Sequence, residues 1–88
     1  MAKILVVDDD EIIRDTLYEL LSDQHACQTA ETAEKALARL AADDYDVVLT
    51  DISMPGLSGL ELLGYVLQRQ PDTPVIIITG IDYRQHFD

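Results

Sequence analysis

Carboxylates follow two apolar segments of the chain, and this placement could support metal-dependent chemistry. Asp8 and Asp9 come directly after residues 4–7, and Asp51 comes directly after residues 47–50. If the two segments are neighbouring parallel strands, the three carboxylates converge at one edge of a sheet. Two carboxylates about 4 Å apart repel by about 4 kcal/mol at an effective dielectric constant of 20. A bound Mg²⁺ or Mn²⁺ would offset this repulsion, because both ions prefer oxygen ligands.

A carboxylate at a strand end beside a metal ion suggests phosphoryl transfer. Asp51 would attack a phosphorus atom and hold an acyl phosphate, while the metal offsets charge on the phosphoryl oxygens. Thr79 follows a further apolar segment, residues 75–78, so its hydroxyl would point into the same crevice. The plainer alternatives are helix-terminal charges for Asp8 and Asp9, and a simple β-forming residue for Thr79. The combination of these residues favours a site.

Strands and helices alternate in the elements that must position these residues. The predicted strands are Lys3–Val7, His25–Ala30, Val47–Thr50 and Val75–Ile78. The apolar runs of the first, third and fourth are typical of strands that helices cover on both faces, whereas His25–Ala30 has the mixed polarity of an edge strand. This order of elements predicts a parallel sheet with right-handed crossovers. A strand order of 2-1-3-4 would place Asp8 beside Asp51.

Three helices are predicted, each starting after a capping residue. The caps are Asp10, Thr32 and Ser58, and Ser58 forms a capping box with Glu61. Each helix carries an apolar stripe that would face the sheet. In the first helix the stripe consists of Ile13, Leu17, Leu20 and Leu21.

Composition limits the class of protein and its partners. The 88 residues predict one small domain with a single core. A net charge of −11, with six basic against 17 acidic residues, argues against direct binding of nucleic acid or of an anionic membrane. Cys27 is the single cysteine, which favours a reducing compartment. We expect neither a signal peptide nor a membrane span, and therefore a cytoplasmic protein.

Three segments resemble the receiver domain of two-component response regulators, the CheY-like family. They read KILVVDDDEIIRDTL, YDVVLTDISMPGLSGLELL and PDTPVIIITG, and together they cover nearly the whole chain to Gly80. The resemblance implies a flavodoxin-like, doubly wound α/β fold with a parallel sheet of order 2-1-3-4. It also implies a phosphoacceptor that switches a protein interaction surface. Such a domain catalyses its own phosphotransfer and dephosphorylation and is not a conventional turnover enzyme.

The resemblance implies a role for each candidate residue. Asp51 matches the aspartate that accepts a phosphoryl group from a sensor histidine kinase or a phosphotransfer protein. Asp8 and Asp9 match the acid pair that holds Mg²⁺, and Asp51 is a further metal ligand. Ser53 matches the position whose backbone carbonyl binds the metal. Thr79 matches the hydroxyl that contacts the phosphoryl group and switches the surface.

The chain departs from the family pattern at its carboxyl end. It stops before the fifth strand, whose lysine contacts the phosphoryl group in the family, and before the last helices. Residues 1–88 are thus interpreted as a single incomplete receiver domain, with an irregular tail at 81–88. The two lysines, Lys3 and Lys35, are expected to lie elsewhere. The strand at 75–78 would then be an exposed sheet edge, which predicts that the chain is a homo-oligomer, a dimer or larger, or an excerpt of a longer protein.

Two other functions remain open at this point. Without the family's lysine, the chain could be an interaction or assembly module of receiver ancestry that is not phosphorylated. An aspartyl-phosphate phosphatase of the haloacid dehalogenase type is less favoured. It would need a second acid two residues after the nucleophile, where this chain has Ser53.

Overall fold

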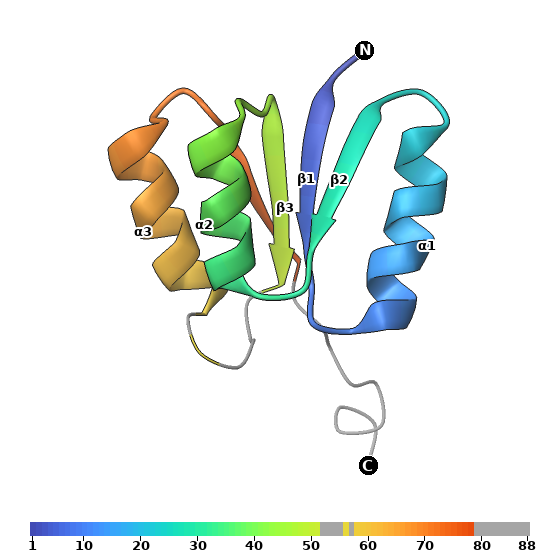
Figure 1. Cartoon of the computed structure of the whole chain (residues 1–88), viewed down its shortest axis with the longest axis horizontal. Helices are drawn as coiled ribbons and strands as arrows, with labels where there is room; N and C mark the ends of the chain where they lie inside the picture. The colour runs from blue at the N-terminus through green and yellow to red at the C-terminus, as the bar shows by residue number, and fades with distance from the viewer. Residues whose placement is uncertain (52–55, 57, 79–88) are drawn as a thin grey trace.

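The computed structural model describes residues 1–51, 56 and 58–78, in which strands and helices alternate (Figure 1). The strands are β1 (Lys3–Val7), β2 (Ala26–Ala30), β3 (Val47–Asp51) and β4 (Val75–Ile78). The helices are α1 (Glu11–Ser22), α2 (Ala33–Ala42) and α3 (Gly59–Arg69). This confirms the predicted order of elements. Within the described residues, no helix combines the length and the apolar character needed to cross a membrane.

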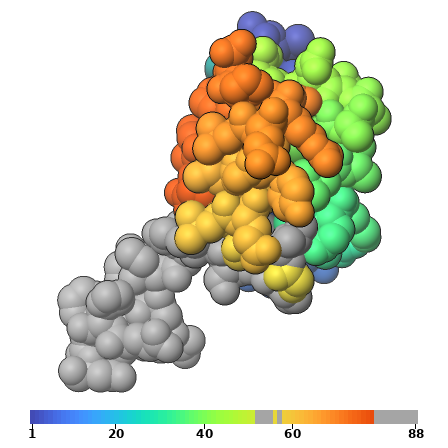
Figure 2. All heavy atoms as spheres, turned by 90° about the vertical axis from the view of Figure 1, so that its left-hand side faces the viewer, coloured from blue at the N-terminus to red at the C-terminus, as the bar shows by residue number. Residues whose placement is uncertain are grey.

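The four strands form one parallel sheet in the order β2-β1-β3-β4. β1 and β3 are therefore central, and β2 and β4 are the edges of the described sheet. Helices α2 and α3 lie side by side on one face, and α1 covers the other face (Figures 1 and 2). The predicted flavodoxin-like, doubly wound sheet of order 2-1-3-4 is confirmed.

Each helix begins after the capping residue that the sequence predicts. The side chain of Asp10 accepts hydrogen bonds from two backbone N–H groups in the first turn of α1, at 2.9 and 3.3 Å. Thr32 accepts one at 3.1 Å in the first turn of α2. Ser58 and Glu61 form the predicted capping box at the start of α3. These bonds satisfy N–H groups that have no partner within the helix, so they define where each strand-to-helix connection ends.

The main core lies between the sheet and the pair α2 and α3. Leu5 of β1, Val48 of β3 and Leu62 of α3 are fully buried there. Ala33 and Ala36 of α2 are also fully buried, and their small side chains allow this helix to approach the sheet closely. The two central strands are thus held together by the best-packed part of the molecule.

Helix α1 is less buried than its apolar stripe predicts. No residue of α1 is fully buried. Leu17 and Leu21 are half-buried, but Ile13 is exposed and Leu20 is 70% exposed. The physical reason is that α1 is the one described helix on its face of the sheet. It packs against β1 and β2 without a neighbouring helix to cover the rest of its stripe.

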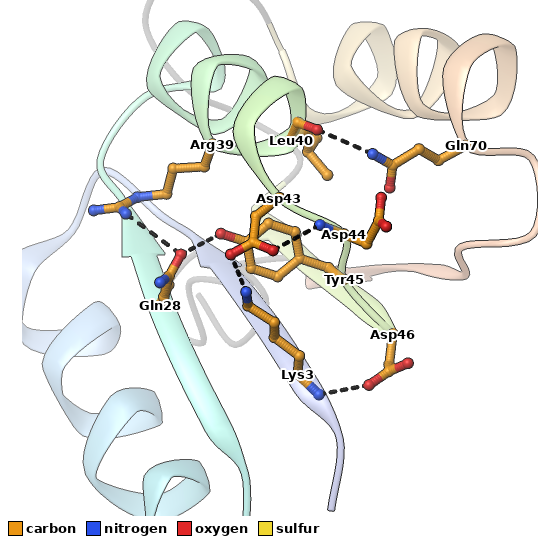
Figure 3. A network of polar contacts seen from close by, with 9 residues as sticks. All are labelled: Lys3, Gln28, Arg39, Leu40, Asp43, Asp44, Tyr45, Asp46 and Gln70. Atoms are coloured by element: carbon orange, nitrogen blue, oxygen red, sulfur yellow. Dashed lines mark hydrogen bonds and ion pairs between the residues drawn. The ribbon is translucent and has the colours of Figure 1, made fainter.

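A polar network closes the amino end of the sheet (Figure 3). The Lys3 ammonium pairs with Asp43 and lies 5.2 Å from the centre of the Tyr45 ring. The Lys3 backbone N–H donates to Asp46 at 2.7 Å, and the Tyr45 hydroxyl donates to Gln28. The network joins the starts of β1 and β3 to β2. It also places Lys3 at the end of the sheet opposite to Asp8 and Asp51.

Leu62→Ala should lower the free energy of unfolding by about 2–5 kcal/mol, because it leaves a cavity in the core. Leu60→Ala on the same helix is the matched control, since Leu60 is 57% exposed, and it should cost less than about 1 kcal/mol. Urea unfolding followed by circular dichroism measures both. Equal losses for the two variants would contradict the described packing of α3.

Candidate metal and phosphoryl site

Three carboxylates meet at the carboxyl ends of the two central strands. Val7 of β1 pairs with Thr50 of β3 in parallel register. The next residue on each strand is an aspartate, Asp8 on one side and Asp51 on the other. One carboxylate oxygen from each of Asp8, Asp9 and Asp51 lies within 4.8 Å of the others. The structure therefore brings together the three acids that the sequence singled out.

Asp8 is fixed by several hydrogen bonds at the end of β1. Its side chain is 3% exposed and accepts a hydrogen bond from the backbone N–H of Asp10 at 2.9 Å. Its backbone N–H donates to the carbonyl of Ala30 at 3.1 Å. Its own carbonyl accepts from the Arg14 guanidinium at 2.9 Å. Asp9 is exposed and Asp51 is half-buried, so the cluster opens toward solvent on one side.

Burial and like charge raise the pKa of Asp8 above its ordinary value of 3.8. Burial is the largest cause, because it disfavours the charged form. The hydrogen bond from the Asp10 backbone acts in the opposite direction, and the charges of Asp51, Asp9 and Asp10 raise the pKa further. Ionising this cluster therefore costs folding free energy, and a cation among the oxygens would remove that cost.

The cluster offers the ligands that a hard divalent cation prefers. All three side chains supply carboxylate oxygens. On an octahedral Mg²⁺ with bonds of about 2.1 Å, adjacent ligand oxygens lie about 3 Å apart and opposite ones about 4.2 Å apart. The 4.8 Å spread of the cluster is slightly larger. It fits an ion held by one or two direct carboxylate contacts, with water completing the coordination.

Two of the predicted site residues, Ser53 and Thr79, lie outside the described residues. Gly56 is described, and it lies in the connection between β3 and α3. Its φ of +80° is in the left-handed region that favours glycine. A Cβ added there would lie 2.7 Å from a carboxylate oxygen of Glu34. The backbone conformation therefore favours glycine here, whereas the close atom belongs to the end of a flexible side chain that can move aside.

The two lysines are engaged away from the carboxylates. Lys3 pairs with Asp43 at the amino end of the sheet, and Lys35 pairs with Glu31 near the start of α2. These contacts agree with the expectation that neither lysine substitutes for the one that contacts the phosphoryl group in the family.

Arg14 is a neighbour of the site that the sequence did not identify. It projects from the first turns of α1 and reaches back to the carbonyl of Asp8. The sequence contains no signal for this contact, because a basic residue six positions after Asp8 on a helix is ordinarily a solvated side chain. The contact depends on the sharp turn between β1 and α1, which the Asp10 cap sets.

Comparison with known proteins agrees with these features. The sequence model of the response regulator receiver domain matches residues 4–87. Response regulator protein FleR of Pseudomonas aeruginosa is 39% identical over 80 residues, which are 90% of this chain and 17% of FleR. The DNA-binding transcriptional regulator NtrC of Salmonella typhimurium is 47% identical over 78 residues, 88% of this chain. The chain spans 17% of the length of each of these two relatives.

A solved structure gives the same result. Response regulator protein TrrA from Thermotoga maritima, in complex with Mg²⁺-BeF, superposes with a TM-score of 0.85 at 39% identity. The match covers 99% of this chain and 76% of the TrrA chain. The fold, the register of β1 with β3 and the sequence match therefore lead to one conclusion: the chain belongs to the response regulator receiver domain family.

Proposed function

We propose that this receiver domain accepts a phosphoryl group on Asp51 in a reaction that depends on Mg²⁺ or Mn²⁺. The observation that carries the proposal is the approach of the Asp8, Asp9 and Asp51 oxygens to within 4.8 Å of one another in a member of this family. The complex of the related TrrA with Mg²⁺-BeF adds support.

The phosphoryl donor is a phosphohistidine of a sensor histidine kinase or of a phosphotransfer protein. A carboxylate oxygen of Asp51 forms a bond to phosphorus while the bond from phosphorus to the donor nitrogen breaks. The donor nitrogen keeps the electron pair, and Asp51 becomes an acyl phosphate. Attack by water on phosphorus later releases phosphate and restores the carboxylate. The output is a change in the surface that the domain presents to its partners.

The chain's own residues orient the reacting groups. When bound, the metal ion offsets negative charge on the phosphoryl oxygens. Asp8 and Asp9 would hold the ion together with Asp51 and, by resemblance to the family, the backbone carbonyl of Ser53. By the same resemblance, the hydroxyl of Thr79 would contact the phosphoryl group and couple its presence to the surface. The hydrogen bonds at Asp8 keep that ligand oriented before the ion arrives.

A second function is favoured by the contacts of the lysines. Lys3 and Lys35 pair with Asp43 and Glu31, so neither of these two lysines is placed to contact a phosphoryl group on Asp51. An interaction or assembly module that binds the metal ion and is not phosphorylated needs no such contact. The phosphorylation experiment below separates the two functions.

We also infer a homo-oligomer that forms through the β4 edge, and a cytoplasmic location. Ile76 of β4 is 53% exposed, and an apolar edge strand invites pairing with another chain.

The charge of −11 argues against nucleic acid and anionic membrane as direct partners. The relative NtrC is named a DNA-binding transcriptional regulator, but this chain covers only 17% of its length. The name therefore does not assign DNA binding to this chain.

Incubation with acetyl phosphate and Mg²⁺ should add one phosphoryl group to the chain, because Asp51 supplies the nucleophile. Intact-mass spectrometry detects the adduct, and hydroxylamine should remove it if it is an acyl phosphate. Asp51→Asn is expected to show no adduct, and so is the wild type in EDTA. An unmodified wild-type chain that still binds Mg²⁺ would instead establish the assembly function.

Asp8→Asn should stabilise the metal-free protein by about 1 kcal/mol at pH 7, because it removes a buried like charge. The pKa of Asp8 is higher in the folded chain than its ordinary value of 3.8, so the protonated side chain stabilises the fold fully below pH 3.8. This stability is lost as the pH rises through the raised pKa. The asparagine oxygen can still accept from Asp10, so the loop is kept. Urea unfolding in EDTA from about pH 3.5 to 7 measures the difference.

Mg²⁺ should reverse this order of stability. It stabilises the wild type by binding only the folded state, and Asp8→Asn should lose most of that gain. Asp72→Asn in the exposed turn before β4 is the matched control and should behave as the wild type. If Asp8→Asn destabilised the metal-free protein, the cost of burying a charged Asp8 among like charges would not be the dominant effect at this position.

Ile76→Lys should shift the protein toward monomer, because a charge on an edge strand opposes pairing between chains. Leu20→Lys on α1 is the control, as Leu20 is also an exposed apolar residue. Sedimentation velocity over a range of concentrations measures both. A wild type that stays monomeric at high concentration would rule out the oligomer.

A further inference from the structure

A groove lies beside β2, the edge strand of the described sheet in Figure 1, and residues of α1, β2 and α2 contribute to its lining. It consists of two adjoining hollows of about 430 and 320 Å³ that share Ala38 and Arg39. The larger hollow lies toward the carboxyl end of β2 and includes Thr29. The smaller one includes Gln28, toward which Arg39 extends in Figure 3. We call the two hollows together the β2 groove.

The larger hollow concentrates the few basic residues of this acidic protein. The chain has six lysines and arginines and a net charge of −11. Three of the six, Arg14, Lys35 and Arg39, line this hollow, and Glu31 is the one acid in its lining. Three positive charges and one negative charge leave a local charge of +2 in the larger hollow, and the acid that lines the smaller hollow, Asp43, is paired with Lys3. At physiological ionic strength the Debye length is about 8 Å, so a ligand in the groove responds mainly to these nearby charges.

Glu31 shows that the hollow stabilises a carboxylate. A hydrogen bond from Lys35 and its charge lower the pKa of Glu31, and the charge of Arg14 lowers it further. The hydrogen bond from Arg14 to the Asp8 carbonyl fixes the position of the Arg14 guanidinium. Arg39 makes a long contact of 3.5 Å with Gln28. A carboxylate from another molecule would therefore meet oriented cationic donors.

The backbone of β2 adds a second means of recognition. The Ala26 N–H donates to Ala2 at 2.9 Å, and the Ala30 carbonyl accepts from Asp8 at 3.1 Å. Since backbone groups alternate along a strand, those of Cys27 and Thr29 point away from β1. Within the described sheet, β2 is an edge with no strand beyond it. An extended peptide can pair with such an edge.

We propose that the β2 groove binds an extended acidic segment of a partner protein. The segment adds to the sheet through the outward backbone groups of Cys27 and Thr29. Its carboxylates lie against Arg14 and Arg39, and the small side chain of Ala38 on α2 leaves room for it. This interaction uses none of the carboxylates of the metal site. The proposal therefore does not depend on whether Asp51 is phosphorylated.

Binding can be measured with a capped synthetic peptide of alternating glutamate and valine, titrated into the full chain and followed by two-dimensional amide NMR. The amide signals of Cys27 and Thr29 should shift, and their hydrogen exchange should slow. Arg39→Gln should weaken binding about threefold to tenfold. Arg69→Gln is the matched control, because Arg69 lies on α3 over the ring of Tyr65, and its dissociation constant should stay within about twofold of the wild type.

Three results would overturn the proposal. The first is equal binding of a lysine–valine peptide, which would mean that charge is not recognised. The second is unchanged affinity in Arg39→Gln. The third is full competition by inorganic phosphate without any change at the Cys27 and Thr29 amides, which would mean that the groove holds only small anions.

Discussion

The parallel pairing of β1 with β3 is the constraint on which the rest of the structure depends. The register that joins Val7 to Thr50 places Asp8 and Asp51 at the same edge of the sheet. Burial of Asp8, together with the like charges around it, raises the pKa of Asp8, and this shift records the cost of the arrangement. The cost is offset by burial of side chains such as Leu5 and Val48 on the same two strands. The packed core and the cluster of like charges therefore depend on the same pair of strands.

The parts of this fold that were predictable from sequence are those with a local cause. Apolar runs predicted β1, β3 and β4, and short polar side chains such as Asp10 and Ser58 predicted where helices begin. The acids at strand ends were recognisable because strand ends in a parallel sheet share an edge. The exposure of α1 and the reach of Arg14 to Asp8 were not predictable, because both depend on neighbours in space. Ser53 was identified through the resemblance and Thr79 from its place after an apolar segment, and both lie outside the described residues.

Charge is distributed unevenly over the edges of the sheet. The carboxylates gather at the carboxyl ends of the central strands, and half of the basic residues gather around the edge at β2. Arg14 belongs to both regions, since it lines the groove and binds the carbonyl of Asp8. A partner at the groove would therefore touch a residue that also positions the proposed metal site. The groove and the proposed metal site are thus separate surfaces that share one contacting side chain, Arg14.

The shallow packing of α1 has a consequence for the motions of the molecule. Native proteins open in local units, and the units with the fewest buried apolar contacts open first. Helix α1 has no fully buried residue, whereas α2 and α3 each have at least two. Its amides should thus lose protection before those of the other helices. Each opening of the α1 amino end would also detach Arg14 from Asp8, so transient unfolding of one helix sets how long the loop after β1 keeps its shape.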